Sequence, residues 1–570
     1  MAFQISPGVN VSEVDLTTVV PSVLTTAGAF AGSFAWGPVN KRIQVDSEIT
    51  LVNTFGKPEA NGYASFFTAA SFLAYGNNLK VVRAANNQTF NADSNTSTTN
   101  VQIANEDVFQ ASYLTSNNYG NYGPFAARYA GSLGNSLTIS VVDAGSYSAT
   151  WNINTIGVAS YVNGAPGTSS QATLAGAAND EIHIIVMDTG GLFTGTKNTV
   201  LEVFQYLSKA SDAKDSLGNS NYYKNFIFNN SKYVYAVDPV SYNTTVSTWG
   251  SALANTNFTT LTQPQTVTLG GGVDAPVNDI DRIAAFGLFS NSDEVDISLV
   301  MLGSQGTTIQ QWVIDNIANS RKDCVAFLSP PSSAVVNQSG NETTLISSWN
   351  TSLARSTSYA FADCGWKYMF DKYNNTYRWV PLNGDIAGLC VNTDNVRDPW
   401  FSPAGFNRGN LKNVVKLAWN PNKTQRDTLY AQGINPVGTF PGNGTVLYGD
   451  KTLQAKPSAF DRINVRRLFI VLEKSIANAA KYSLFEFNDE TTRAQFVGLV
   501  TPFLRDIQGR RGIYDFRVVC DTTNNTPQVV DSNQFVGDIY IKPARSINFI
   551  QLNFVAVRTG VDFTEVVGKF

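Results

Sequence analysis

The sequence predicts a mixed α/β (α+β) multidomain protein, in which a discontinuous α/β core carries an inserted, polar, β-rich protrusion and extended terminal arms. Three observations predict this arrangement. The chain has 570 residues, which is more than one hydrophobic core usually organises. Strand–helix–strand patterns occur on both sides of a long stretch rich in Asn, Ser, Thr and Gly. Both ends of the chain alternate between apolar and polar residues without a neighbouring hairpin partner.

Charge and hydropathy exclude several classes of partner. Lys and Arg number 40 and Asp and Glu number 44, without an acidic or basic tail, so we expect no direct contact with nucleic acid. No run of about 18 apolar residues is present, so we expect no membrane insertion. The start "MAFQISPGVN" lacks the basic and apolar regions of a signal peptide, which predicts a soluble chain made in the cytoplasm.

The first elements in order are an N-terminal arm and the first segment of the core. Residues 1–21 form the predicted arm, since "SPGVNVSEVDLTTVVP" has the alternation of a strand between two prolines. Residues 22–86 form the core segment, with a strand that ends near Gly37, a helix and the buried strand "NLKVVRA". The helix is predicted by apolar residues at i, i+3, i+4 and i+7 spacing: Tyr63, Phe66, Phe67, Ala70 and Leu73.

Residues 87–268 form the predicted insertion. Its composition turns to Asn, Ser, Thr, Gly and Tyr with few charges, and short strand-like pieces such as "SLTISVVDA" indicate a folded β-rich module. The composition changes back near "LGGGVD", which begins at Leu269.

The core is predicted to resume at 269–425, followed by a C-terminal inner domain at 426–546 and an arm strand at 547–570. "VDISLVML", "GTTIQQWVIDNIANSR" and "CVAFLSPP" read as a βαβ unit, whose strands should pair in parallel. A long helix is predicted in "AFDRINVRRLFIVLEKSIANAAKY". In "INFIQLNFVAV", Ile550, Leu552 and Phe554 point to one side of a half-buried strand.

Residues suited to catalysis or metal binding are scarce. His183 is the only histidine, and it lies in a strand-like segment where a satisfied structural role is expected. Cys324, Cys364, Cys390 and Cys520 are scattered without a CxxC pair, so we expect them reduced and buried. "GGLFTGTK" has Thr196 where a phosphate-binding loop needs lysine, and it reads as a turn, as "LGGGVD" does. We therefore expect no enzymatic activity, no metal and no cofactor.

One charged segment, "KYMFDKYNNTYRWVPLNGDIAGLC", stands out in a chain with 15% charged residues. Two aromatic strands flank Asn374 and Asn375, and asparagine tolerates the left-handed backbone of a tight hairpin. With those two residues as the loop, Asp371 would face Arg378 directly, and the charges would form a structural cross-strand pair.

Several motifs together resemble the contractile tail sheath protein of T-even-type myophages. They include "SPGVNVSEVD", "YGNNLKVVRA", "WFSPAGFNRG", "QRDTLYAQGINPV", "FDRINVRRLF", "VVCDTTNNTP" and "KPARSINFIQLNFVA". They cover residues 1 to about 86 and about 269 to 570 in the same order, whereas residues 87–268 carry no such resemblance.

The resemblance implies a structural virion protein of the phage tail, made in the host cytoplasm. It implies hexameric rings of the chain stacked helically around a tail tube, which contract to drive the tube through the host envelope. The implied partners are the chain itself, the tail tube protein, and baseplate and tail terminator proteins. It also implies that the arms add strands to a sheet shared between subunits, through Val9, Val11 and Val14 at one end and Ile550, Leu552 and Phe554 at the other.

Two further hypotheses concern contacts and alternatives. Arg462 and Arg466 would share one helix face beside Arg467, either as a solvated face or as a contact with the tail tube or an adjacent subunit. A wall-degrading hydrolase would need a pair of carboxylates in a cleft, and no spacing singles one out. A tube or baseplate protein fits the length and the arms less well.

Overall fold

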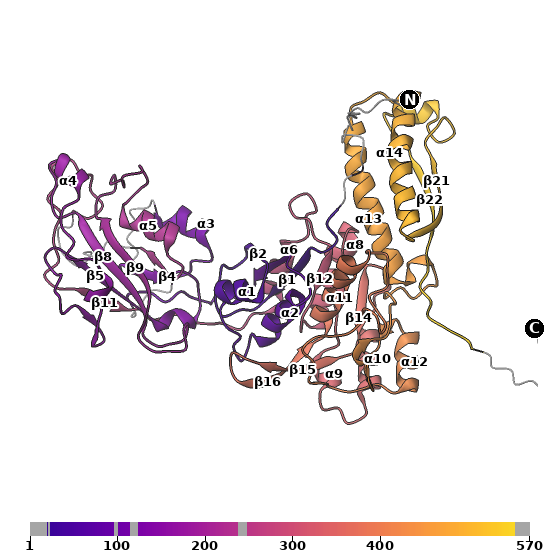
Figure 1. The fold of residues 1–570 in the computed structure, drawn as a ribbon, viewed down its shortest axis with the longest axis horizontal. Helices are drawn as coiled ribbons and strands as arrows, with labels where there is room; N and C mark the ends of the chain where they lie inside the picture. Colours follow the sequence, from indigo (N-terminus) through magenta and orange to yellow (C-terminus); the bar gives the residue numbers. More distant parts are fainter. Residues whose placement is uncertain (1–19, 21–22, 96–100, 115–122, 238–247, 553–570) are drawn as a thin grey trace, which may run out of the picture.

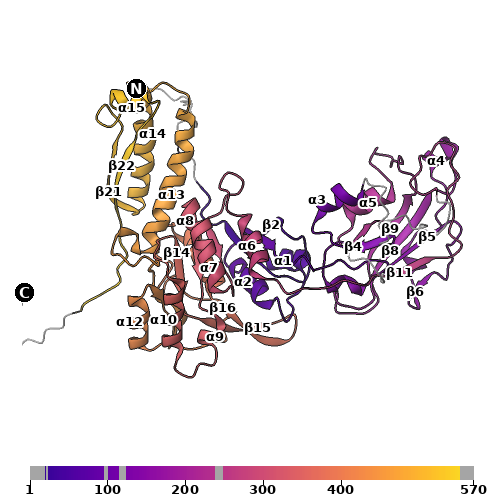
Figure 2. The ribbon, with the colours of Figure 1, turned by 180° about the vertical axis from the view of Figure 1, so that it is seen from behind.

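The computed structural model describes residue 20 and residues 23–95, 101–114, 123–237 and 248–552. Three bodies follow one another (Figure 1): the protrusion, the α/β core, and a body built on two long helices. The view from behind shows the same separation (Figure 2). Within the described ranges, no helix is long and apolar enough to cross a membrane, and no three His, Cys, Asp or Glu side chains gather as metal ligands would.

One large sheet organises the core. Seven strands of the described chain lie in the order β18-β14-β13-β12-β1-β3-β2. Neighbours are parallel except β2, which runs antiparallel to β3. Both predicted core segments contribute, so the mixed α/β class and the parallel βαβ unit are confirmed. The strands are β1 (Gly28–Gly32), β2 (Arg42–Val45), β3 (Leu79–Arg83), β12 (Leu299–Met301), β13 (Val325–Leu328), β14 (Ala360–Asp363) and β18 (Ile434–Asn435).

Small residues in the central strand let helices approach closely. All of β1 (sequence GAFAG) is buried, and a Cβ added to Gly28 would lie 2.6 Å from the ring of Phe72 in α2. Helix α2 (Tyr63–Leu73) contains the whole predicted apolar stripe and packs on β1, while α11 (Asn383–Val396) packs against α2 and against β12 and β13. The other core helices are α1 (Glu48–Phe55), α6 (Asp279–Gly287), α7 (Thr307–Val313), α8 (Asn319–Arg321), α9 (Ser332–Val335), α10 (Glu342–Leu353) and α12 (Lys423–Ala431).

The protrusion has its own sheets and cores. Its largest sheet has the order β11-β5-β8-β9, and β5 is buried along its whole length. Its elements are α3 (Glu106–Phe109), β4 (Phe125–Ala127), β5 (Leu137–Asp143), β6 (Asn152–Ile153), β7 (Ile156–Gly157), α4 (Ser170–Leu174), β8 (Glu181–Asp188), β9 (Thr199–Ser208), α5 (Tyr223–Asn230), β10 (Val234–Ala236) and β11 (Gln265–Thr268).

Two core residues fasten the protrusion. The buried guanidinium of Arg83 donates to the carbonyl oxygens of Phe34 (2.9 Å), Gly37 (2.9 Å) and, across the junction, Ala130 (2.8 Å). Trp36 packs edge-on against Tyr129 and Phe193 of the protrusion, with ring centroids 5.3 and 5.0 Å away. The chain enters and leaves side by side, because Phe90 and Val273 exchange both backbone hydrogen bonds.

The third body pairs two helices with a two-stranded sheet. Helices α13 (Ile463–Ala480) and α14 (Glu490–Gly509) pack through Leu468, Leu472, Val500 and Leu504. Strands β21 (Ile513–Val519) and β22 (Asp538–Pro543) are antiparallel and cover this core, with α15 (Pro527–Asp531) between them in sequence. The core sheet extends to β18, beyond residue 425, so the predicted boundary at 425/426 is too early.

The predicted two-residue hairpin loop is wrong. Strand β15 (Trp366–Asp371) pairs with β16 (Thr376–Pro381) so that Asp371 faces Thr376 and Met369 faces Arg378. Four residues form the turn, because Asp371 Oδ1 accepts the N–H groups of Tyr373 (3.0 Å) and Asn374 (3.2 Å). Of the two asparagines only Asn375 has positive φ, whereas a two-residue type I′ turn needs both. Arg378 Nε lies 3.5 Å from Asp371 Oδ2, diagonally across the ladder. Strand β17 (Lys416–Leu417) pairs with β15, whereas β19 (Val437–Phe440) and β20 (Gly444–Leu447) form a separate antiparallel pair.

Candidate functional site: the root of the C-terminal arm

The chain leaves the third body after β22 and is held to the core over a few residues before it becomes exposed. Ala544 N–H donates to Gly512 O at 3.0 Å. Ser546 and Asn548 then contact the carboxylate of Asp450, which is only 2% exposed. We call this contact region the arm root: Ser402, Tyr430, Asp450, Arg462, Ser546 and Asn548.

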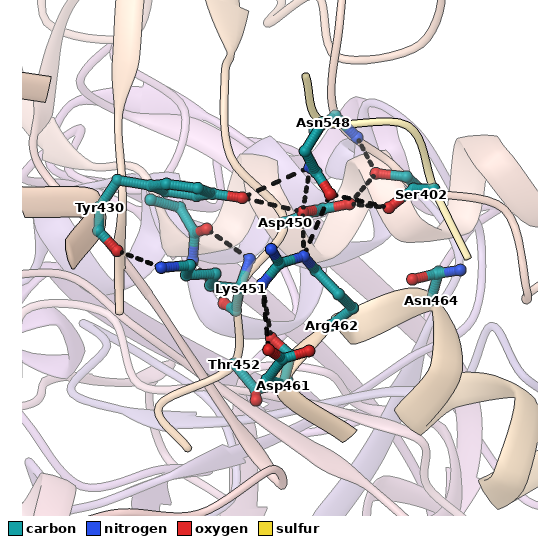
Figure 3. A network of polar contacts seen from close by, with 12 residues as sticks. Ser402, Tyr430, Asp450, Lys451, Thr452, Asp461, Arg462, Asn464 and Asn548 are labelled. Atoms are coloured by element: carbon teal, nitrogen blue, oxygen red, sulfur yellow. Dashed lines mark hydrogen bonds and ion pairs between the residues drawn. The ribbon is translucent and has the colours of Figure 1, made fainter. Parts of the chain in front are cut away.

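Asp450 is the centre of the arm root (Figure 3). Its Oδ2 accepts hydrogen bonds from Ser402 Oγ (3.1 Å) and Ser546 Oγ (2.8 Å). Its Oδ1 accepts from Tyr430 OH (3.1 Å) and Asn548 Nδ2 (3.0 Å). Arg462 Nε lies 3.4 Å from Oδ1 and also donates to Asn548 Oδ1 at 3.2 Å. One buried carboxylate therefore joins a loop, helix α12 and the start of helix α13 to the residues at the base of the arm.

Backbone bonds fix the position of Asp450. It follows β20, and its carbonyl accepts Ile463 N–H at 2.9 Å, at the start of α13. The next residue, Lys451, donates its N–H to Asn435 Oδ1 of β18 at 2.7 Å. Residues 450 and 451 are thereby hydrogen-bonded to strand β18 at the edge of the core sheet and to the first residue of α13.

The surroundings also perturb the neighbouring titratable groups. Burial, followed by the negative charge of Asp450, raises the pKa of Tyr430 well above its usual range, so its hydroxyl stays a donor. Burial and the positive charge of Arg462 lower the pKa of Lys451, whose Nζ donates to Tyr430 O at 2.8 Å. The polar groups of the arm root hydrogen-bond one another, so their role is to hold the start of the arm against the rest of the chain.

Beyond the arm root, apolar side chains point into solvent. Ile547, Phe549, Ile550 and Leu552 are between 72% and 84% exposed and belong to no strand of the single chain. The other residues predicted for the arm strands, Val9, Val11, Val14 and Phe554, lie outside the described residues.

The predicted exposed arginine face is wrong. Arg462 precedes α13 with an extended backbone, so it does not share a helix face with Arg466. Arg466 is 6% exposed, donates to Ser358 Oγ and Tyr359 OH, and lies over two aromatic rings. Arg467 is 4% exposed and pairs with Asp394 at 2.5 Å. Both guanidinium groups are satisfied inside the chain because α13 is packed on two sides.

Two places where a ligand could be sought are filled by the chain itself. At the carboxyl edge of the parallel sheet, where α/β proteins bind ligands, buried Asn383 bonds Gly303 and Ser329, and Ser329 Oγ donates to Asp363. In the "GGLFTGTK" loop, the backbone N–H groups of residues 191–194 donate to the carboxylate of Asp188. These donors hold a side chain of the protein.

His183 and the cysteines have structural surroundings. The His183 ring is buried, with Nε2 3.0 Å from Gly164 O and Nδ1 accepting Tyr206 N–H at 3.1 Å. Burial lowers the pKa of His183. Cys324, Cys364, Cys390 and Cys520 are free and buried, as the sequence predicted.

Comparison with known proteins decides the family. A family description, "Phage tail sheath protein central domain", matches residues 295–453, and "Phage tail sheath C-terminal domain" matches residues 455–556. The tail sheath protein of Vibrio phage KVP40 is 33% identical, covering 99% of this chain and 100% of its own length. That of Enterobacteria phage T4 is also 33% identical, covering 99% of each. The chain belongs to the tail sheath protein family.

Membership in this family makes the chain a structural, non-enzymatic component of a phage tail. Its fold is also that of a sheath tail protein from Listeria innocua, with a TM-score of 0.53 at 12% identity over 92% of this chain and 96% of the other. Both alignments cover 99% of this chain and so include residues 87–268. The expectation that these residues carry no resemblance to the family is therefore wrong.

The sequence analysis did not find the arm root. Asp450 and Asn548 are 98 positions apart. Nothing in their spacing connects them, although Asn548 lies within the motif "KPARSINFIQLNFVA" that resembles the family.

Proposed function

We propose that this chain polymerises into stacked hexameric rings around the phage tail tube, and that the stack contracts to drive the tube through the host envelope. The observation that carries the proposal is the exposed apolar arm beyond a firmly bonded root. A segment with four large exposed apolar side chains gains free energy when it pairs with another surface. The tail sheath family to which the chain belongs supports the same reading.

The strand acceptor is proposed to be the sheet of β21 and β22. Among the residues that the structure describes, these two strands pair only with each other, which leaves one edge of each open. Two-stranded sheets are marginally stable alone, and an open edge accepts an added strand through backbone hydrogen bonds. We assign the terminal arms of neighbouring copies, residues 1–21 and 547–570, as those added strands.

An arm attached only through backbone bonds suits a sheath that changes shape. Strand addition leaves the bodies free to turn while the copies stay linked, and no nucleotide is required. The tail tube, the baseplate and the tail terminator are the further partners in this proposal. The protrusion is assigned to the outer radius.

Arm variants of the full chain test the proposal. Deletion of residues 1–20, or truncation before Ile547, should leave a folded monomer that forms no tubes in sedimentation and electron microscopy. As a matched pair, Ile550→Asp with Leu552→Asp should block assembly, whereas Ile550→Val with Leu552→Val should preserve it because valine keeps strand propensity. Normal tubes from either deletion contradict the proposed arm exchange.

A further inference from the structure

An exposed aromatic loop joins the two long helices. In residues 481–489, which we call the tip loop, Tyr482, Leu484, Phe485 and Phe487 are 62% to 105% exposed. Phe485 also has a φ of 71°, a left-handed conformation that is rare for a bulky residue. The fold therefore accepts backbone strain while placing a phenylalanine fully in solvent, which indicates that a partner covers the loop.

A second exposed aromatic cluster lies beside α12. Phe406, Phe440 and Tyr448 form a three-ring cluster, which we call the ring patch, with centroids 5.1 to 5.8 Å apart. Phe406 and Tyr448 are 44% and 46% exposed. The guanidinium of Arg426 lies 5.4 Å from the centroid of Phe440 and 5.8 Å from that of Tyr448.

The two surfaces have complementary charge. The tip loop exposes Glu486, and Glu490 follows it at the start of α14. Arg426 donates to Pro421 O, and among the ion pairs of the described residues it has no carboxylate partner. Arginine pairs with carboxylates while its planar group stays stacked on aromatic rings.

The two surfaces lie at opposite sides of one molecule. The α13–α14 hairpin projects from the core to one side, and α12 lies at the other side of the core (Figures 1 and 2). The tip loop and the ring patch of one chain therefore cannot meet. When two different surfaces meet between copies, the contact is head-to-tail. Such a contact extends into an open stack unless it closes into a ring.

We propose that the tip loop of one copy docks on the ring patch of the next copy, with Glu486 facing Arg426. This contact rests on the proposed polymerisation and names one surface that links successive copies. It is separate from the arms, because neither surface includes an arm residue.

Cross-linking of the full chain tests the contact. Tubes are assembled from a mixture of Phe487→Cys and Tyr448→Cys chains and treated with a short bis-maleimide. The four native cysteines are buried, which keeps the background low. We expect a covalent dimer from the mixture and none from either variant alone. The matched control mixes Phe487→Cys with Leu217→Cys, an 85% exposed position in the protrusion, and should give no dimer.

Charge reversal gives a second measurement. Glu486→Arg or Arg426→Glu alone should raise the concentration needed for assembly on the order of tenfold, and the two together should restore it. Tubes without the 487–448 link, or a double reversal no better than the single ones, overturn the docking contact while polymerisation stands. If the unsubstituted chain forms no tubes, the proposed function fails and the contact fails with it.

Discussion

Replacing Asp450 by asparagine should free the C-terminal arm without unfolding the protein. Asp450 accepts hydrogen bonds from two side chains of the segment that leads into the arm, Ser546 Oγ at 2.8 Å and Asn548 Nδ2 at 3.0 Å. A hydrogen bond to a charged group contributes about 1.5–3 kcal/mol. Asparagine keeps one acceptor oxygen but loses the charge and turns the other position into a donor. We therefore expect the arm root to weaken by about 2 kcal/mol, which raises its open population roughly 30-fold.

Hydrogen exchange of the unassembled chain measures this change. The amide of Ala544, which donates to Gly512 O, lies two residues before Ser546 and should lose protection by that factor. Core strands such as β13 should exchange as before. The control is Asp427→Asn, an exposed carboxylate on neighbouring α12, which should change nothing. Unchanged exchange at Ala544 in a folded Asp450→Asn chain would refute the anchoring role.

Three more predictions follow from buried groups and from the junction. Burial raises the pKa of Asp363 to about 8, so between its ordinary value of 3.8 and pH 8 the folded state holds a proton that the unfolded state has lost. The free energy of unfolding should therefore fall as pH rises from 5.5 to 8, by up to about 1.4 kcal/mol per unit, and Asp363→Asn should flatten this slope in urea titrations. Asp371 is fully buried and accepts turn N–H groups, so Asp371→Ala should cost about 2 kcal/mol, more than Arg378→Gln; equal costs in denaturation would show that only the ion pair matters. Replacing residues 87–268 with a short Gly/Ser linker, together with Trp36→Gln to avoid a newly exposed indole, should preserve tubes in electron microscopy; a folded core that cannot assemble would contradict the decorative role.

Local sequence patterns predicted the structure correctly where neighbouring residues along the chain determine it. The 3.6-residue spacing of apolar residues from Tyr63 to Leu73 predicted a helix where α2 lies, although residues 65–72 are buried on every side and not on the stripe alone. The βαβ unit predicted over residues 295–331 corresponds to the parallel pair β12 and β13. The motifs that resemble sheath proteins predicted the family correctly, because many short matches in the same order are stronger evidence than a single match.

Tertiary packing decided what these patterns left open. The turn after Asp371 has four residues because a buried carboxylate caps it, which alternation along the strands does not reveal. Arg466 and Arg467 are buried because α13 touches both the core and α14, so an arginine on an apparent helix surface was not exposed. Hydrophobic periodicity reports one face of an element, whereas burial depends on everything packed around it.

The sequence alone determined the class of the protein, its family and the apolar character of its C-terminal arm. Only the tertiary structure decided how that arm is held. Asp450 reaches Ser402, Tyr430, Ser546 and Asn548 from positions 20 to 98 residues away. A single buried charge needs several donors at hydrogen-bonding distance, and the folded chain supplies them from distant segments, so no local pattern records their meeting.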